Sequence, residues 1–262
     1  MEIELRQVSV FLGERPVLAE VNLRLLPEGV TMLLGRNGAG KTTLMKTILG
    51  RYRPKRGQVL LDGRPVEQWT AGERSRRIAY IPQEREIPMG CTALEYAAMG
   101  QAPYTPFYKN YDKIGLKEGA AALEELGIAA LGARQMTRLS GGEKKLVAIA
   151  RTRVQKTPWL ILDEPTASLD FTREHHFLRL LRKESQKGRG VFLTIHNPSL
   201  AVQYADRILV LGEKSILGDF CREKDGFPRR LEECLRQIYG PEILLTEQEG
   251  RQALLWKEEE HV

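Results

Sequence analysis

Strongly apolar segments of four or five residues recur along the 262-residue chain. Such runs are typical of β-strands that are buried on both faces of a sheet. They occupy residues 30–34, 78–81, 159–162 and 191–195. Segments with helical character lie between them, for example at 42–50. This alternation of strands and helices predicts an α/β fold.

The pattern changes between residues 83 and 157, where the strand signals disappear. Residues 93–99 and 119–126 are typical of helices. Residues 101–117 are rich in Pro, Tyr and Gly, so we expect an irregular surface loop there. The sequence therefore predicts a helical subdomain, at about residues 84–157, that is inserted in the α/β core.

The end of the chain forms a further segment. Apolar residues recur at helical spacing between charged ones at 228–239, which predicts a short amphipathic helix. Two apolar segments flank a polar turn at 248–251, so we expect a terminal hairpin. The predicted domains are thus a main domain at 1–220 and an extension at 221–262.

The composition limits the cellular setting. No apolar run approaches the ~18–20 residues that a membrane-spanning helix requires, and the N-terminus lacks the basic-then-apolar order of a signal peptide. Three widely spaced cysteines indicate neither a disulfide framework nor a zinc site. The net charge is +6, but its densest basic run, at 51–56, lacks the motif context of an RNA-binding surface. We therefore expect a cytoplasmic protein without a nucleic-acid partner, and a solvated loop at this run.

A glycine-rich segment follows the first apolar strand. Residues 35–43 read G-R-N-G-A-G-K-T-T, which satisfies the G-x-x-x-x-G-K-[ST] pattern between a predicted strand and a predicted helix. Glycines let the backbone N–H groups surround an anion, and the following helix adds the positive end of its dipole. Lys41 is expected to reach the terminal phosphates of a nucleotide and Thr42 to bind Mg²⁺. The predicted phosphate-binding residues are Gly35, Asn37, Gly38, Ala39, Gly40, Lys41, Thr42 and Thr43.

Two carboxylates, Asp163 and Glu164, directly follow the apolar strand at 159–162. A buried strand of a parallel sheet delivers its terminal residues to the edge where a phosphate loop also lies. Asp163 would hold Mg²⁺, which keeps several waters when it is bound. Glu164 could act on the attacking water as a general base.

A Ser-Gly-Gly sequence at 140–142 precedes a predicted helix at 144–151. A hydroxyl, an unobstructed backbone and a helix dipole can bind phosphate together, although the same tripeptide also serves as an ordinary helix cap. The run at 139–143, L-S-G-G-E, resembles the signature motif of the ABC-transporter ATPases.

The resemblance to ABC-transporter ATPases extends beyond this run. That family carries a glutamine after a strand, matched by Gln83, a Ser-Leu-Asp loop, matched at 168–170, and a histidine after a later strand, matched by His196. The motifs follow the family order across residues 35–196 and lie in a resemblance that covers most of residues 1–220. It implies the ABC ATPase fold, in which a P-loop NTPase core carries an antiparallel β subdomain and a helical insertion.

The resemblance also implies roles for single residues. Gln83 would bind Mg²⁺ and sense the γ-phosphate, and His196 would contact the γ-phosphate. Phe11 would stack on adenine, and Leu12, the next residue, is the alternative for this contact. The implied catalytic residues are Glu164, His196, Lys41 and Gln83. The implied Mg²⁺ ligands are Thr42, Gln83 and Asp163. The implied ATP contacts outside the phosphate loop are Phe11, Ser140, Gly141, Gly142 and Asp170.

Two segments narrow the resemblance to a subfamily. Residues 92–101 and 196–206 are similar to importer ATPases for iron-siderophores, haem, cobalamin and related metal chelates. The chain departs from the family pattern at Glu143, where glutamine is usual, and at 150–155, where the helix carries additional polar groups. The implied function is ATP-driven import of a metal chelate that the membrane subunit selects.

The family resemblance implies partners as well as a fold. Two copies of the chain would stack head to tail and enclose two ATP molecules, as a two-fold interface requires. A membrane-spanning permease would dock on the helical insertion, near Gln83 and residues 87–101, and hold the chain at the cytoplasmic face of the membrane. A separate substrate-binding protein could complete such an importer.

Two other classes of protein compete with this interpretation. A soluble ATPase of the same fold, acting in iron–sulfur assembly, DNA repair or on the ribosome, would have no permease partner. Ribosome-acting relatives carry two copies of the motor and repair relatives carry long insertions, so the iron–sulfur ATPase is the open alternative. A nucleotide-binding regulator without turnover would lack a hydrolysis group, whereas Glu164 and His196 are both present.

Overall fold

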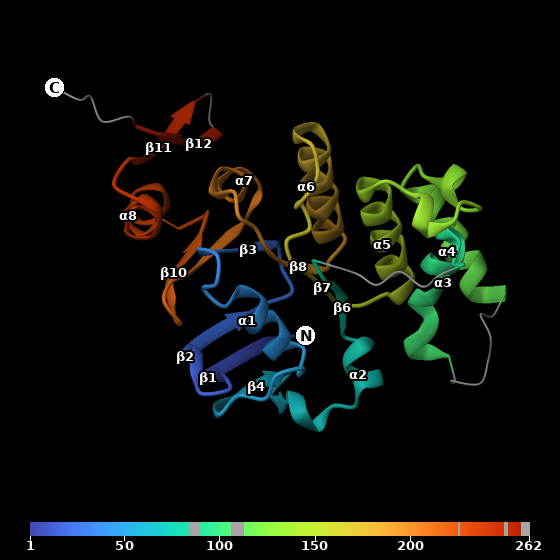
Figure 1. The fold of residues 1–262 in the computed structure, drawn as a ribbon, viewed down its shortest axis with the longest axis horizontal. Coiled ribbons are helices and arrows are strands. Elements are labelled where there is room, and N and C mark those ends of the chain that lie inside the picture. Colours follow the sequence, from blue (N-terminus) through green and yellow to red (C-terminus); the bar gives the residue numbers. More distant parts are fainter. Residues whose placement is uncertain (84–89, 106–112, 225, 249–250, 258–262) are drawn as a thin grey trace. The chain divides into compact units, whose positions relative to one another are not determined.

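The computed structural model describes residues 1–83, 90–105, 113–224, 226–248 and 251–257. The chain forms two compact units. The first comprises Met1–Gln68 together with Leu178–Val262, and the second comprises Trp69–Phe177. Figure 1 labels the helices and strands of both units.

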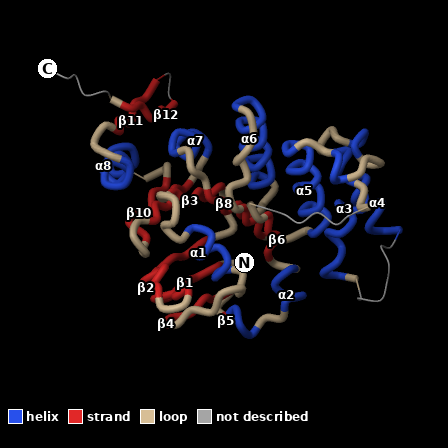
Figure 2. The backbone as a smooth tube through the Cα atoms, viewed as in Figure 1, coloured by secondary structure: helices blue, strands red, loops and turns tan. Residues whose placement is uncertain are grey.

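The first unit contains an antiparallel sheet of four strands, in the order β2-β1-β4-β5. Its strands are β1 (Ile3–Leu12), β2 (Arg15–Leu25), β4 (Arg56–Leu61) and β5 (Arg64–Pro65). Along β2, buried Val21, Leu23 and Leu25 alternate with more exposed residues. This period of two shows that one face of the sheet lies on the core while the other faces solvent. Figure 2 shows these strands grouped beside the first helix of the unit.

The first unit also carries a largely parallel sheet, in which β3 lies between β8 and β9. Its strands are β3 (Val30–Leu34), β8 (Gly190–Thr194), β9 (Arg207–Leu211) and β10 (Ile216–Cys221). Every residue of β3 and β8 is buried, as expected for strands that are covered on both faces. The outer strand β10 pairs with β9 in the antiparallel sense. The helices α1 (Lys41–Ile48) and α7 (Pro198–Tyr204) follow β3 and β8.

The C-terminal segment folds as a helix, α8 (Phe227–Tyr239), and a hairpin of β11 (Ile243–Gln248) and β12 (Arg251–Trp256). The buried face of α8 consists of Phe227, Leu231, Cys234 and Leu235. A Cβ atom at Gly218 in β10 would lie 3.1 Å from the Cys234 Sγ atom, so α8 packs closely on this edge strand. The extension is therefore part of the first unit and not a detached tail.

The second unit combines a pair of parallel strands with a set of helices. The strands are β6 (Ile78–Ile81) and β7 (Trp159–Leu162). The helical elements are α2 (Ala71–Ser75), α3 (Ala93–Ala98), η2 (Met99–Tyr104), α4 (Lys113–Glu125), η3 (Ala129–Leu131), η4 (Met136–Arg138) and α5 (Gly141–Gln155). The helix α6 (Phe171–Gln186) begins in the second unit and ends in the first.

The prediction of an irregular loop at 101–117 is wrong at both ends of this range. Residues up to Tyr104 continue the 3₁₀ helix η2, and α4 already begins at Lys113. Gly115, the glycine of this range, lies inside α4, where a Cβ atom would be 3.5 Å from the Ala98 carbonyl oxygen, and Pro103 lies inside η2. Small residues allow two helices to approach at this distance. The central part of the expected loop lies outside the described residues.

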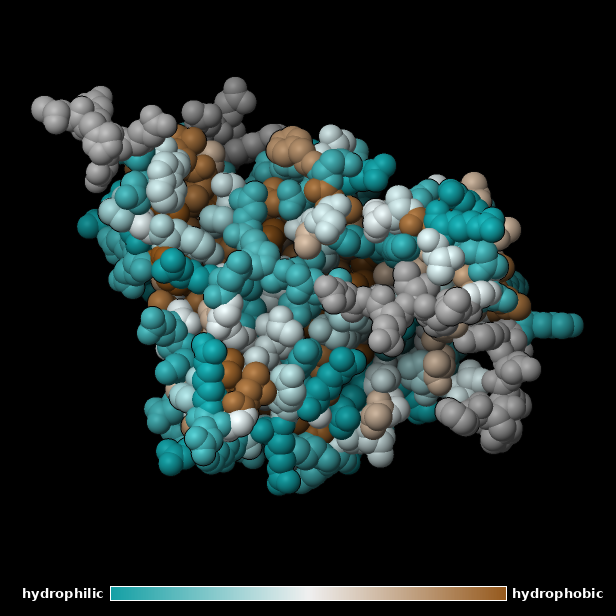
Figure 3. All heavy atoms as spheres, in the orientation of Figure 1, coloured by the Kyte–Doolittle hydropathy of each residue, from teal (hydrophilic) through white to brown (hydrophobic). Residues whose placement is uncertain are grey.

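The compact units divide the chain at other places than the domain boundaries expected from the sequence, and those boundaries stay predictions. Among the helices that the structure describes, none combines the length and the apolar character of a membrane span. Figure 3 shows hydrophilic residues over most of the visible face, as expected for a chain with 28% charged residues.

Candidate active site

The glycine-rich loop joins the end of β3 to the beginning of α1 within the first unit. Gly40 precedes α1 in a left-handed conformation, with φ at 105°. A Cβ atom at Gly40 would lie 3.1 Å from the Val17 Cγ1 atom of β2, so a side chain would be both strained and crowded there. The fold therefore requires glycine at this position and sets Val17 against the loop, a contact that the sequence analysis missed.

The Lys41 side chain is folded back over the loop and is 5% exposed. Its Nζ atom donates hydrogen bonds to the carbonyl oxygens of Gly35, at 2.8 Å, and Arg36, at 3.2 Å. The ammonium group thus already lies among the backbone groups that would surround a phosphate. Charge-assisted bonds to an anion are stronger than these bonds to neutral carbonyls, so a phosphate can draw the ammonium group away from them.

The beginning of α1 suits an anion. In the part of the chain that the structure describes, no side chain caps this helix, and no acidic residue lies in its first turn. Unpaired N–H groups and the helix dipole favour an anion at such a position. Thr42 is half-buried and Thr43 is buried, whereas Asn37 and Gly38 are exposed on the loop.

His196 leaves the neighbouring strand at the same edge of the sheet. The strands β3 and β8 are parallel, and the N–H of Ile195 donates to the carbonyl of Leu33 at 3.2 Å. His196 is exposed directly after this pairing, next to the point where Gly35 begins the loop. The structure thus brings the predicted histidine and the phosphate loop together, as the carboxyl ends of adjacent parallel strands require.

The predicted adenine contact lies at the tip of the first hairpin. Phe11 is half-buried, and Leu12, the competing residue, is 44% exposed. The Lys55 Nζ atom lies over the Phe11 ring, 4.7 Å from its centroid, which is a cation–π contact. The basic run at 51–56 is largely exposed, as expected for a solvated loop, and Lys55 adds a positive charge beside the ring.

The second unit holds the two carboxylates. Asp163 directly follows β7 and is 2% exposed, and its N–H donates to the Ile81 carbonyl at 2.9 Å. Glu164 follows with a positive φ of 46°, which is uncommon for a residue with a side chain and costs about 1–2 kcal/mol. Uncommon backbone conformations of this kind cluster at functional sites.

Gln83, which follows β6, meets Glu164 directly. The Gln83 Nε2 atom donates to the Glu164 Oε2 atom at 2.7 Å. Two of the predicted hydrolysis residues are therefore in contact within one unit. Because the amide donates, the carboxylate oxygen is an acceptor, which is the form a general base needs.

The Ser-Gly-Gly sequence forms the beginning of α5. The Ser140 Oγ atom accepts the N–H of Glu143, and the Glu143 carboxylate accepts the N–H of Ser140 at 2.7 Å. These hydrogen bonds hold the pKa of Glu143 below its usual range, and the bond from the Ser140 backbone N–H has the largest effect. A carboxylate can thus serve in the capping box where the family usually has glutamine. Ser140 and Gly141 are exposed, and Gly142 is half-buried.

The loop after the acidic pair packs against this helix start. A Cβ atom at Gly142 would lie 3.4 Å from the Arg173 side chain and 3.6 Å from that of Leu169. Asp170 Oδ1 accepts the N–H of Arg173 at 2.9 Å and so caps the first turn of α6. Lys145, half-buried, donates to the Ala167 carbonyl, and burial lowers the pKa of its ammonium group. The sequence carried no signal for Arg173 or Lys145.

The additional polar groups of α5 find partners. The Arg153 guanidinium pairs with Glu125 of α4 at 3.2 Å. The Thr152 hydroxyl donates to the Ile149 carbonyl at 2.9 Å. This departure from the family pattern therefore connects α5 to α4 through Arg153.

A parallel strand that leads into a glycine-rich anion loop, in a chain whose other parallel strand ends in Asp-Glu, defines a P-loop nucleoside triphosphatase. The family described as ABC transporter matches residues 18–167. The chain belongs to this family and is an ABC-transporter ATP-binding subunit, an ATPase.

Individual relatives agree with this assignment. The chain is 34% identical to a hemin import ATP-binding protein of Myxococcus xanthus, over 95% of this chain and 94% of the relative. It is 40% identical to the protein of the same description from Hahella chejuensis, over 81% of this chain and 84% of the relative. A solved metal-chelate type ABC transporter in an inward-facing conformation has the same fold, with a TM-score of 0.81, 22% identity and 98% coverage of both chains.

These findings confirm the predicted family and the ABC ATPase fold. The assignment of single residues to ATP, Mg²⁺ and hydrolysis stays a prediction. Within the first unit the structure brings together the phosphate loop and His196. Within the second it brings together Gln83 with Glu164, and Gly142 with the loop that ends at Asp170.

Proposed function

We propose that this chain is the ATP-hydrolysing subunit of a hemin importer. The observation that carries the proposal is the 34% identity, over almost the full length of both chains, with a protein named for hemin import. The same name belongs to the relative that is 40% identical. Both names refer to import, which favours the importer over the soluble iron–sulfur ATPase.

In this function the phosphate loop binds ATP. The backbone donors at the beginning of α1 and the Lys41 ammonium neutralise the phosphates, while His196 lies at the same sheet edge to meet the γ-phosphate. Phe11 would stack on adenine, and its ring also makes the cation–π contact with Lys55. Phosphoryl transfer needs chiefly such positioning and charge neutralisation.

The residues assigned to Mg²⁺ fit its chemistry. Thr42, Gln83 and Asp163 offer hydroxyl, amide and carboxylate oxygens, the hard ligands that Mg²⁺ prefers. In the described residues no group of three His, Cys, Asp or Glu side chains could hold a metal ion. This agrees with an ion held by one carboxylate together with nucleotide phosphates, since Mg²⁺ seldom occupies an all-protein cage. When bound, the ion would neutralise charge on the phosphates.

Glu164 is the proposed general base. Its carboxylate accepts the Gln83 amide at 2.7 Å, so Gln83 orients it and must loosen this bond when the carboxylate turns to water. Loss of a positioned base lowers rates by about 10²- to 10⁴-fold. Gln83 would thereby link the hydrolysis step to the helices that follow it in the chain.

We propose further that two copies join around ATP, and that a membrane-spanning permease holds the pair at the cytoplasmic face of the membrane. The exposed Ser140 and Gly141 at the beginning of α5 would contact the nucleotide held by the second copy. The permease would dock near Gln83 and residues 87–101, of which residues up to 89 lie outside the described part of the chain. A substrate-binding protein would deliver hemin to the permease.

The test combines crosslinking with transport. A Met99→Cys variant, with the three native cysteines replaced by serine, is treated with a crosslinker in native membranes, and an Arg53→Cys variant in the other unit serves as the control. We expect a multi-span protein to be linked at position 99 only. The recovered complex in proteoliposomes should take up hemin in an ATP-dependent way and leave cobalamin and ferric siderophore outside. Recovery of soluble proteins alone, or uptake of another chelate, would contradict the proposal.

A further inference from the structure

The loop at residues 164–170 begins with Glu164, the proposed general base. Two of its residues carry side chains at positive φ, with 46° at Glu164 and 67° at Ser168. Residues other than glycine seldom adopt this region, so the surroundings must hold the loop in place. Within the loop, the N–H of Ala167 donates to the Glu164 carbonyl at 3.2 Å. This bond links the backbone of the proposed base to Ala167.

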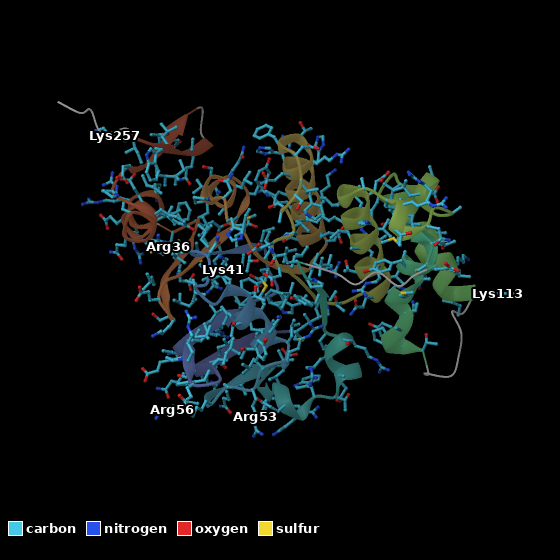
Figure 4. All side chains as sticks on the ribbon, in the orientation of Figure 1. Arg36, Lys41, Arg53, Arg56, Lys113 and Lys257 are labelled. Carbon is cyan, nitrogen blue, oxygen red and sulfur yellow. The ribbon has the colours of Figure 1, made fainter. Side chains whose placement is uncertain are left out.

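A charged side chain of α5 holds the other backbone group of Ala167. Side chains project from α5 along its length (Figure 4), and the Lys145 ammonium group donates a hydrogen bond to the Ala167 carbonyl. Lys145 is half-buried, and burial lowers the pKa of its ammonium group, while the Glu174 charge acts in the raising direction. A hydrogen bond from a charged donor is stronger than one between neutral groups, and partial burial strengthens it further. Ala167 is therefore fixed on both sides, by Glu164 and by Lys145.

The beginning of α5 also packs against the far end of the loop. A Cβ atom at Gly142 would lie 3.4 Å from the Arg173 side chain and 3.6 Å from that of Leu169. The Arg173 guanidinium pairs with Asp170, the last residue of the loop, at 3.2 Å. The first two turns of α5 thus contact the loop at two places, through the Lys145 side chain and through the backbone at Gly142.

These contacts form a continuous path inside the second unit. It runs from Ser140, which caps α5, through Lys145 and Ala167 to Glu164. The Glu164 carboxylate is held separately, because it accepts the Gln83 amide at 2.7 Å. Gln83 thus orients the carboxylate, whereas Lys145 fixes the backbone from which the carboxylate projects.

We propose that Lys145 is a positioning residue for Glu164, which ties the loop of the base to the helix that begins at the Ser-Gly-Gly sequence. When Ser140 and Gly141 contact the nucleotide held by a second copy, α5 sets the loop and brings Glu164 to its working position. Hydrolysis therefore follows the contact between the two copies. The inference rests on the roles proposed for Glu164 and Ser140 in ATP hydrolysis and dimerisation.

Lys145→Met keeps most of the length of the side chain and removes the ammonium group. We expect kcat to fall about 10- to 100-fold, because a small misplacement of a catalytic group costs this much. ATP binding, measured by calorimetry, should stay within about twofold, since Lys145 contacts the loop of the base and not the phosphate loop. Lys145→Arg keeps a charged donor for the Ala167 carbonyl and should restore kcat to within about threefold of the wild type.

Arg153→Met is the matched control for a purely structural role. It removes a cation from the same helix, together with its ion pair to Glu125 at 3.2 Å. This variant should lower the melting temperature and leave kcat within about twofold. A structural Lys145 would behave in the same way.

A double-mutant cycle with Glu164→Gln shows through which residue Lys145 acts. Single-turnover hydrolysis of labelled ATP is measured for the wild type, Lys145→Met, Glu164→Gln and the double variant. If Lys145 acts through Glu164, the double variant hydrolyses ATP within about threefold of the rate of Glu164→Gln, because residues that act as a unit are not additive. If Lys145 acts independently, the two reductions multiply. Should Lys145→Met not fold, Lys145→Gln enters the same cycle.

The outcomes separate the two proposals. A wild type that neither binds nor hydrolyses ATP overturns the proposed function and this inference with it. A wild type that hydrolyses ATP, with an unchanged kcat in Lys145→Met or with reductions that multiply in the cycle, overturns the positioning role alone. A kcat that falls in Lys145→Met, recovers in Lys145→Arg and falls no further than in Glu164→Gln when both changes are combined supports it.

Discussion

Two helices of this protein begin with glycine-rich segments assigned to phosphate, and they begin in different ways. The helix α1 starts after Gly40, without a side-chain cap among the described residues. The helix α5 starts after Ser140, whose side chain forms a complete capping box with Glu143. No side chain takes up the first N–H groups of α1, whereas Ser140 already accepts an N–H of α5. An uncapped start favours strong binding, whereas a capped start offers a hydroxyl and exposed glycines for a weaker second contact.

The difference in capping fits a fixed order in which the two helix starts contact ATP. ATP would bind first to the uncapped α1 within one copy and only then to the capped α5 of another copy. Four changes test this comparison.

ATP hydrolysis removes the nucleotide that both helix starts would contact, so the first variant prevents hydrolysis. Glu164→Gln should lower kcat by at least ~10²-fold and leave ATP binding intact, because the amide keeps the shape of the carboxylate but cannot accept the proton of water. Gel filtration should then show an ATP-dependent dimer in which both helix starts contact nucleotide. Turnover at the wild-type rate would exclude Glu164 as the base.

Lys41→Ala tests the uncapped start. The variant loses charge-assisted hydrogen bonds to phosphate and should bind ATP about 10- to 100-fold more weakly in calorimetry. Lys46→Ala is the matched control, since Lys46 belongs to the same helix and its charge lies over the Tyr52 ring. Equal affinities of the two variants would contradict the assignment of the phosphate loop.

Ser140→Ala tests the capped start. Loss of an N-cap costs about 1 kcal/mol in the free energy of unfolding. Thr70→Ala removes an equivalent capping box, formed with Glu73 at the start of α2. Both variants should lose similar stability in urea unfolding, but only Ser140→Ala should weaken the ATP-dependent dimer in the Glu164→Gln background. Equal dimerisation of both variants would show that Ser140 serves only as a helix cap.

The smallest effect concerns the acid response of the same cap. The pKa of Glu143 is lowered in the folded state, so its contribution is present above the unfolded value of 4.5 and is lost as the pH falls through the folded value. Glu143→Gln keeps a capping side chain that does not titrate. Its stability should decline less than that of the wild type between about pH 5 and pH 3, as measured by thermal unfolding. Identical slopes would show that Glu143 titrates alike in both states.

Local motifs made much of this protein predictable. The phosphate loop, Asp163 and Glu164 lie where strand ends place them, because each motif is continuous with the strand that carries it. The error at residues 101–117 arose because glycine and proline are typical of turns but also occur in helices, as Gly115 does in α4 and Pro103 in η2. The contact of Val17 with the phosphate loop at Gly40 could not be predicted, since it depends on how β2 packs on the loop and on nothing local to either residue.

The contact between η2 and α5 has a mechanical consequence. A Cβ atom at Gly100 would lie 2.3 Å from the Arg151 carbonyl, so the two backbones touch without a compressible layer of side chains. The helix α5 has 15 residues and spans about 22 Å from its beginning at Gly141. The helix α5 is therefore a rigid element that contacts η2 near its C-terminal end. We expect a displacement of Gly141 at the beginning of α5 to be transmitted to η2 almost undiminished. Gly100→Ala would force the two backbones apart and should weaken this transmission.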